Sequence, residues 1–245
     1  MMMEFTYELH LHSCLSPCGD DLMTPNNIAG MAMLNGVKIA ALTDHNTSRN
    51  CPAFFEACAK VGVIPVAGME LTTAEDIHVI CLFPTLESAM EFDFIVSEKL
   101  IKVENKPKIF GNQLLLDEND EVVGEEKYLL INATSLDLES AYKLCDSFGG
   151  VCYPAHIDRE SGGLIAVLGD FPSEPHYPAF ELNFKDSFEE YTARYPAIVN
   201  KQFVVSSDAH NLWSISEAEN FLELDDEPYS SAKVREALIG YLKGK

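Results

Sequence analysis

The sequence predicts an α/β fold, a distorted (β/α)7 TIM-like barrel with an inserted β-hairpin. Two observations lead to this prediction. Strand-like apolar runs alternate with helix-like stretches along most of the 245 residues, which is typical of a parallel sheet covered by helices. Most of these runs also end in histidine or a carboxylate residue, as expected where an active site lies at the carboxyl ends of barrel strands.

The predicted strands are short runs of apolar residues. About seven can be counted against the eight of a standard barrel, so one unit is expected to be missing or distorted. In chain order they cover residues 5–13, 38–45, 63–71, 76–83, 151–158, 179–184 and 203–210. The run 179–184 is included without a metal ligand. The other runs place their candidate ligands at carboxyl ends, except for His78, which lies near a strand start.

The first predicted helix covers residues 24–36. Thr24 is a candidate N-cap, Pro25 suits the first helical position, and Gly36 follows the last turn. Helical spacing of apolar residues, with glycine or proline at several ends, predicts the remaining helices. They cover residues 47–62, 84–102, 136–150, 188–196, 214–222 and 230–245.

One segment interrupts the alternation of strands and helices. Residues 106–133 contain two short apolar runs around a DEND turn, which predicts a β-hairpin insertion. We favour a surface excursion for this segment over a lid or a dimer contact. Since no repeat or linker marks a boundary, residues 1–245 are expected to form a single domain.

Charge and composition exclude several classes of protein. The chain has 17 basic and 39 acidic residues and a net charge of −22, so a polyanion should be repelled and long nucleic acid is an unlikely partner. The N-terminus lacks the features of a secretory signal, and no apolar stretch is long enough to span a membrane. An odd number of cysteines, seven, fits a reducing compartment. We therefore expect a cytoplasmic protein, while its oligomeric state stays open.

The candidate ligands together predict a polynuclear metal site. Imidazole and carboxylate groups are the usual ligands of zinc, manganese and non-haem iron. The alternative, buried and hydrogen-bonded structural histidines, accounts less well for their recurrence at strand ends. The candidates are His10, His12, His45, Glu70, His78, His156, Asp208 and His210, with Cys18 and Asp20 in the loop after the first strand.

These motifs resemble those of the PHP (polymerase and histidinol phosphatase) family of metal-dependent phosphoesterases. The resemblance rests on the order and spacing of several short motifs, because none is specific alone. They are His10-x-His12, Thr43-Asp44-His45, Gly68-x-Glu70, Pro154-Ala155-His156 and Ser207-Asp208-Ala209-His210. The resemblance implies a distorted seven-stranded barrel whose cleft holds two or three divalent metal ions.

The resemblance also implies a role for each ligand. His10, His12, Glu70 and Asp208 would hold one metal. Glu70 would bridge to a second metal, completed by His78 and His156. His45 and His210 would hold a third, with Cys18, Asp20 or neither as a further ligand, and a thiolate there would favour zinc or ferrous iron.

Three residues are expected to take part in catalysis: Glu70, Arg159 and Asp208. Two metals clamped by a shared carboxylate can activate a water and stabilise the oxygens at phosphorus. Arg159 follows His156 by three residues and is a candidate phosphate clamp, the alternative being a surface salt bridge. Asp44 and Asp158 could orient histidine rings, or they could cap a helix or a turn.

The sequence therefore predicts a metal-dependent phosphoric ester hydrolase that acts on a small phosphorylated metabolite of the nucleotide or sugar phosphate class. Two alternatives stay open. One is a 3′–5′ exonuclease-like module of the same family. The other is a metal-bound sensor or scaffold without turnover, an idea kept open by the unusual loop around Cys18.

Overall fold

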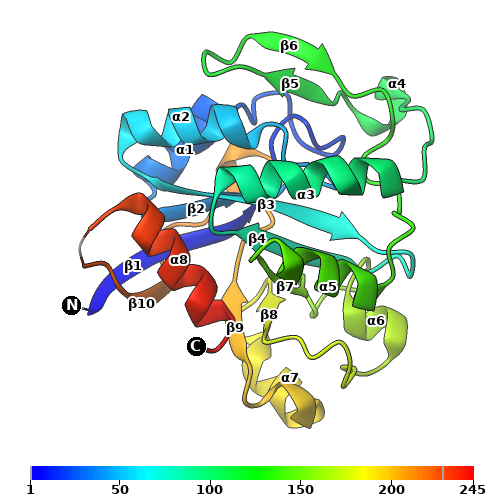
Figure 1. The fold of residues 1–245 in the computed structure, drawn as a ribbon, viewed down its shortest axis with the longest axis vertical. Helices are drawn as coiled ribbons and strands as arrows, with labels where there is room; N and C mark the ends of the chain where they lie inside the picture. The colour runs from blue at the N-terminus through cyan, green and yellow to red at the C-terminus, as the bar shows by residue number, and fades with distance from the viewer. Residues whose placement is uncertain (1, 228) are drawn as a thin grey trace.

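The computed structural model describes residues 2–227 and 229–245. Its main sheet has six strands in the order β10-β1-β2-β3-β4-β7 (Figure 1). β1, β2 and β3 are parallel neighbours, whereas β10, β4 and β7 run antiparallel to the strands they join. The strands are β1 (Met2–Leu11), β2 (Ile39–Leu42), β3 (Ile64–Thr72), β4 (His78–Phe83), β7 (Val151–Pro154) and β10 (Phe221–Asp225).

The main sheet curls toward a separate parallel pair, β8 (Ala179–Leu182) and β9 (Gln202–Val205). Single backbone hydrogen bonds join the two sheets. Ile157 N–H, just after β7, donates to Glu181 O in β8 (2.9 Å), and His12 N–H, just after β1, donates to Ala209 O beyond β9 (3.1 Å). The α/β class is thus confirmed with a curled half-barrel sheet. Among the described strands, the ladders do not continue around a complete (β/α)7 barrel.

The direction of β4 departs from the predicted parallel alternation. A tight turn, in which Thr73 N–H donates to Ile77 O, leads directly from β3 into β4, so the two strands pair antiparallel with Thr72 opposite His78. A connection this short cannot make a parallel crossover. As a result, the start of β4 lies at the edge where β1, β2 and β3 have their carboxyl ends.

Helices cover the outer face of the sheet and close one end of it (Figure 1). Successive strand residues point to opposite faces, and each face has its own apolar core. One core, with Leu42, Met69 and Phe83, packs against helices of the outer layer, and the other, with Leu9, Ile80 and Tyr153, packs against α8. The main helices are α1 (Pro25–Leu34), α2 (Cys51–Val61), α3 (Leu86–Lys99), α5 (Leu138–Ser147) and α8 (Ser231–Leu242).

Shorter helical segments lie in the connections. They are α4 (Pro107–Phe110), α6 (Leu164–Leu168), α7 (Ser187–Arg194) and the 3-10 turns η1 (Pro196–Ile198) and η2 (Leu212–Ser214). The prediction of a helix over residues 214–222 was wrong. η2 ends at Ser214, and the edge strand β10 begins at Phe221. Alternation in β10, where Leu222 and Leu224 are buried between exposed neighbours, is the strand pattern that the sequence carried there.

The expected hairpin is present as β5 (Leu114–Leu116) and β6 (Val122–Glu125) within the predicted segment. It is fixed to the start of the chain. Asp120 accepts hydrogen bonds from Thr24 Oγ1 (2.5 Å) and Asn26 N–H (3.1 Å), and Leu114 N–H donates to Cys14 O (2.9 Å). The hairpin therefore supports the loop that follows β1.

None of the helices in the described part of the chain has the length and apolar character needed to cross a membrane.

Candidate metal centre

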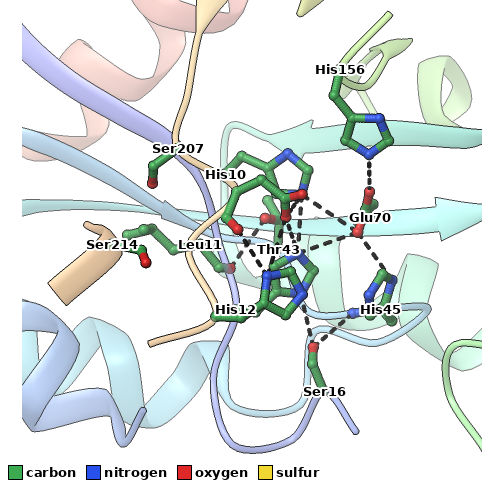
Figure 2. A network of polar contacts seen from close by, with 12 residues as sticks. His10, Leu11, His12, Ser16, Thr43, His45, Glu70, His156, Ser207 and Ser214 are labelled. Carbon is green, nitrogen blue, oxygen red and sulfur yellow. Dashed lines mark hydrogen bonds and ion pairs between the residues drawn. The ribbon is translucent and has the colours of Figure 1, made fainter. Parts of the chain in front are cut away.

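The candidate ligands converge at the edge where β1, β2 and β3 have their carboxyl ends (Figure 2). Glu70 lies in β3 at the centre, with rings from the ends of β1 and β2 on one side and His156, after β7, on the other. His78 joins them because β4 starts at this edge. The structure thus brings together residues that are up to 200 positions apart in the sequence.

The largest group of potential ligand atoms comes from His10, His12, Glu70 and Asp208. The two Nε2 atoms lie 3.0 Å apart. Glu70 Oε2 lies 3.4 Å from His10 Nε2 and 3.2 Å from His12 Nε2, and Asp208 Oδ1 lies 3.3 Å and 3.1 Å from the same two nitrogens. Ligands about 2.0–2.1 Å from a tetrahedral ion are about 3.3–3.4 Å from one another, so these spacings suit a bound metal.

The Glu70 carboxylate faces two sets of imidazole nitrogens with its two oxygens. Oε2 faces His10 and His12, and it also lies 3.0 Å from His45 Nδ1. Oε1 lies 2.8 Å from His78 Nδ1 and 2.9 Å from His156 Nε2. This position is the one expected of a carboxylate that bridges two metal ions, and the whole cluster suits a multi-metal site.

His45 occupies a position between two groups of ligand atoms. One group joins it to Glu70 and His78, and another joins it to His12 and His210. The pairing of His45 with His210, which the family resemblance implies, therefore has a geometric counterpart. The structure adds the approach of His45 to Glu70, a contact that the sequence motifs do not predict.

Several buried polar atoms of the cluster have no hydrogen-bond partner among the residues that the structure describes. They are His45 Nδ1, Glu70 Oε2, His156 Nδ1 and Asp208 Oδ1. Buried polar groups normally have a partner, and a set of unsatisfied ones at a single point needs an explanation such as a bound ion. Three of these four residues, His45, Glu70 and Asp208, also belong to the groups of potential metal ligands, so the donor set fits divalent cations.

The neutral state of two histidines favours metal binding. Burial, which the charge of Glu70 offsets only in part, lowers the pKa of His45 to about 4. Burial followed by the neighbouring His12 lowers the pKa of His210 to about 3. Since neutral imidazole is the form that binds metal, both rings are ready to coordinate at neutral pH without releasing a proton.

The carboxylates and the His-x-His pair show the opposite balance. Burial alone would lower the pKa of His12, but the carboxylates of Asp208 and Glu70 raise it to about 9. Burial likewise opposes ionisation of Glu70, yet His78 and His45 hold its pKa well below the usual range. Positive charge between these groups is therefore favoured, whether a proton or a metal ion supplies it.

The loop after β1 places Cys18 and Asp20 differently. Cys18 lines the pocket over the cluster, and desolvation of its sulfur, followed by the charge of Glu70, raises the pKa of its thiol to about 12. Asp20 is exposed, and its Oδ1 accepts the N–H of Leu22 (2.8 Å). Neither side chain belongs to a group of potential ligand atoms among the described residues.

Glu181 of β8 is a site residue that the sequence reasoning missed. Its fully buried Oε1 accepts hydrogen bonds from His10 Nδ1 (2.8 Å) and from His156 N–H (3.1 Å). Such a partner fixes the tautomer and orientation of a ligating ring, because it leaves Nε2 free to face the metal. The polar residue in the middle of the apolar run AFELNF was the available signal.

The two aspartates proposed to orient histidines have different roles. Asp44 reaches His12 indirectly: Ser16 Oγ donates to Asp44 Oδ1 (2.7 Å) and lies 2.9 Å from His12 Nδ1. Asp158 instead accepts the backbone N–H groups of Asn183 (2.9 Å) and Phe184 (3.0 Å). The alternative of turn stabilisation therefore applies to Asp158.

Arg159 lies at the rim of the cluster. Its NH1 group pairs with Asp208 Oδ2, and its side chain is 46% exposed. A guanidinium has five N–H donors, so most of them stay available toward the pocket.

The backbone at two of the candidate ligands is strained. His156 has φ 27° and Asp208 has φ 52°, a region that residues other than glycine rarely adopt. Such strain persists where the surrounding structure imposes it and is concentrated at functional sites.

The pocket over the cluster is small, about 200 Å³, and is lined by Cys18, His45, Glu70, His78, Ile131, His156, Arg159, Ser161, Asp208 and His210. Gly162 follows Ser161 of this lining and lies against the ring of His78. A side chain at Gly162, which has φ +68°, would place its Cβ 2.9 Å from the ring of His78. Glycine is therefore required for His78 to reach Glu70.

Comparison with known families shows to which family this chain belongs. The model of the PHP domain matches residues 8–206, which include every histidine and carboxylate of the cluster except Asp208 and His210. The chain belongs to the PHP family. This match confirms the resemblance seen in the sequence motifs. Members of this family are metal-dependent hydrolases. No curated protein matches the chain by sequence.

Solved structures share the fold of this PHP protein at low identity. The lesion-specific endonuclease Q from Pyrococcus furiosus has a TM-score of 0.66 and 19% identity, covering 99% of this chain and 56% of its own. A protein from Bifidobacterium adolescentis that is described as a metal-dependent phosphoesterase has a TM-score of 0.58 and 17% identity, and the match covers 95% of both chains. The PHP protein thus spans little more than half the length of the endonuclease.

A second endonuclease Q structure corrects one expectation. It shares the fold with a TM-score of 0.59, 18% identity and coverage of 97% of this chain and 57% of its own, and it is a complex with a 27-mer duplex whose abasic lesion lies at the active site. The prediction that long nucleic acid is an unlikely partner was therefore wrong. Net charge is a property of the whole surface, whereas binding at a site depends on the groups around it.

Proposed function

We propose that this PHP protein hydrolyses a phosphate ester with the aid of two or three divalent metal ions. The observation that carries the proposal is the Glu70 carboxylate, whose two oxygens face separate sets of imidazole nitrogens. When bound, divalent metal ions at such a site lower the pKa of a water and stabilise the charge that develops on phosphate oxygens.

The residues of the chain would divide the remaining tasks. Glu70 holds its two oxygens toward both halves of the cluster, and Glu181 keeps the Nε2 atom of His10 directed inward. Arg159, which lines the pocket, would donate hydrogen bonds to a phosphate group at its rim, a contact that planar guanidinium groups make well. Asp208 holds the guanidinium in this position.

The neutral His45 and His210 are the candidate ligands of a third metal, together with His12. Cys18 is nearer to this group than Asp20, because Cys18 lines the pocket and Asp20 is turned toward its own loop. Zinc, manganese and iron all suit the imidazole and carboxylate ligands.

The size of the pocket supports a small phosphorylated substrate. A cavity of about 200 Å³ has room for a phosphate and part of the group it carries. The test is turnover of a panel of sugar phosphates, nucleoside monophosphates and 4-nitrophenyl phosphate with zinc, manganese or iron restored. Loss of turnover in Glu70→Ala, with the fold intact, would support the proposal. Unchanged turnover in that variant would refute it.

A second candidate function is cleavage of DNA at a lesion. The similarity of fold to endonuclease Q, including its complex with an abasic duplex, favours it. The same protein would be tested with a labelled duplex that carries one abasic site and with the intact duplex. Strand cleavage beside the lesion, dependent on Glu70, would select this function over hydrolysis of small esters.

A further inference from the structure

A second cleft lies directly beside the metal pocket. It has a volume of about 460 Å³, within the range of small-ligand sites, and lies between α3 and the segment that follows β6. Two pairs of consecutive residues separate it from the metal pocket: His45 and Ile131 line the metal pocket, while Asn46 and Leu130 line the cleft. Consecutive Cα atoms are about 3.8 Å apart, so the two spaces share a wall one residue thick.

The shared wall is held by hydrogen bonds. The Asn46 side-chain amide donates to Leu130 O (2.7 Å) and to Asn132 O (2.9 Å), and its Oδ1 accepts the N–H of Thr72 (2.9 Å). Asn46 also has a positive φ of 50°, which asparagine tolerates better than most residues. The position of the cleft relative to the metal ligands is therefore fixed.

Aromatic side chains line the cleft and its edge. Tyr128 is partly buried in the wall, and the ring of Phe94, on α3, is 66% exposed at the opening. Lys102 lies over the Tyr128 ring, with Nζ 5.5 Å from the ring centre. Flat rings with a cation beside them are the features that bind the bases of nucleotides.

The carboxylates in the cleft are already satisfied by the protein. Glu126 pairs with Arg49 and accepts the N–H of Tyr128 (2.8 Å). Asp93 accepts the hydroxyl of Thr47 and the N–H of Ser48, both at 2.7 Å. The basic groups are less completely used, because Lys102 has no carboxylate within ion-pair distance among the described residues.

The chain beside the cleft is basic although the protein as a whole is acidic. Residues 99–108 contain four lysines and one glutamate, a local charge of +3 (4 − 1), against −22 for the whole chain. All four lysines are exposed, and the single Glu104 pairs with Lys127 (2.9 Å) outside the segment. An anionic ligand is therefore attracted here while the rest of the surface repels it.

We propose that this cleft binds a nucleotide unit, with its base against Tyr128 and Phe94 and its phosphate at Lys102, adjacent to the ester that the metal centre cleaves. The inference rests on the proposed phosphoesterase function and specifies its substrate class. The nucleotide can be free or part of a nucleic acid strand, since both offer the same base and phosphate.

Binding to metal-loaded protein tests the proposal separately from hydrolysis. The two probes are a fluorescent single-stranded oligonucleotide with phosphorothioate linkages, which resist cleavage, and a fluorescent nucleoside monophosphate. Phe94→Ala and Lys102→Ala change exposed side chains, so the fold should be kept. Lys38→Ala is the matched control, because Lys38 is an exposed lysine just before β2, at the opposite end of that strand from the metal ligands.

We expect Phe94→Ala to weaken binding about 5- to 150-fold, the effect of losing one stacked base. We expect Lys102→Ala to weaken binding and to reduce the salt dependence of the oligonucleotide by about 0.7 in the log–log slope, the value for one lost phosphate contact with a single strand. Tyr128→Phe, which keeps the ring, should bind like the unchanged protein.

Tighter binding of the oligonucleotide than of the monophosphate, with these losses, would assign the cleft to a nucleic acid strand. Equal binding of both would assign it to a free nucleotide. Failure of both probes to bind, or losses in Phe94→Ala and Lys102→Ala no larger than in Lys38→Ala, would overturn the inference. Turnover of 4-nitrophenyl phosphate, measured on the same variants, shows independently whether the metal centre is an active phosphoesterase.

Discussion

Replacing Glu181 with glutamine tests how the protein aims His10 at the metal centre. The substitution keeps the shape of a side chain that is 0% exposed but removes the charge that accepts the N–H of His10 Nδ1 at 2.8 Å. Loss of such a partner behind a ligating histidine typically weakens metal binding about 10- to 100-fold. This range equals about 1.4–2.7 kcal/mol.

The same substitution should also lower the stability of the fold. Glu181 Oε2 has no hydrogen-bond partner among the described residues, so an amide N–H group placed there would be buried without an acceptor. The cost is about 1–3 kcal/mol. Metal affinity would be measured by competition with a chromophoric chelator, and stability by urea unfolding of the same samples.

Glu8→Gln is the matched control for this experiment. Glu8 is also buried in β1, but its carboxylate accepts backbone N–H groups of Ser207 and His10, and no hydrogen bond or ion pair joins it to an imidazole ring among the described residues. We expect Glu8→Gln to leave metal affinity within about twofold of the unchanged protein. Equal affinities for Glu181→Gln and the unchanged protein, or equal losses in the two variants, would refute the positioning role of Glu181.

Three further predictions concern other parts of the molecule. Gly162→Ala should reduce metal content and turnover, because its Cβ would meet the His78 ring at 2.9 Å. Gly169→Ala is the control: Gly169 also has a positive φ, +81°, but no atom lies within 4 Å of its Cβ, so this variant would carry only the backbone cost. Equal effects of the two substitutions would contradict the steric argument. Burial raises the pKa of Asp93, so the native state holds a proton more tightly than the unfolded chain does. The contribution of this proton to the free energy of unfolding is complete below the unfolded pKa of about 3.9. It is lost as pH rises through the native pKa. Asp93→Asn should flatten that decline in urea unfolding between pH 4 and 8, and an unchanged slope would disprove it. Arg159→Ala should lower kcat about 10- to 150-fold, because one charged hydrogen bond to phosphate is lost. The metal content should stay unchanged. Loss of metal in this variant would instead give Arg159 a structural role.

The sequence was sufficient to predict which histidine and carboxylate residues the fold brings together, because they recur at the ends of apolar runs. His78 was among these candidates and lies beside Glu70, but the sequence could not explain why a strand start belongs there. The explanation is the tight turn that makes β4 antiparallel to β3, and such pairing depends on tertiary contacts rather than on local pattern.

The remaining features depend on contacts between segments that are distant in the chain. Glu181 was read as part of an ordinary strand, since nothing near residue 181 announces the His10 ring 171 positions away. Asp20 was a candidate ligand by its residue type, but its own turn uses its carboxylate. The segment 214–222 was predicted as a helix because most of it precedes β10, and the alternation of buried and exposed residues that marks a strand begins only at Phe221.

The most direct test of the account is elemental analysis of the purified protein together with the phosphate-ester assay, comparing the unchanged chain with Glu70→Ala. Glu70 lies within 3.4 Å of five imidazole rings, so its loss should disrupt both halves of the cluster at once. We predict two to three metal ions per chain in the unchanged protein, fewer in Glu70→Ala, and loss of turnover. A chain without bound metal, or a variant that keeps both metal and turnover, would contradict the account.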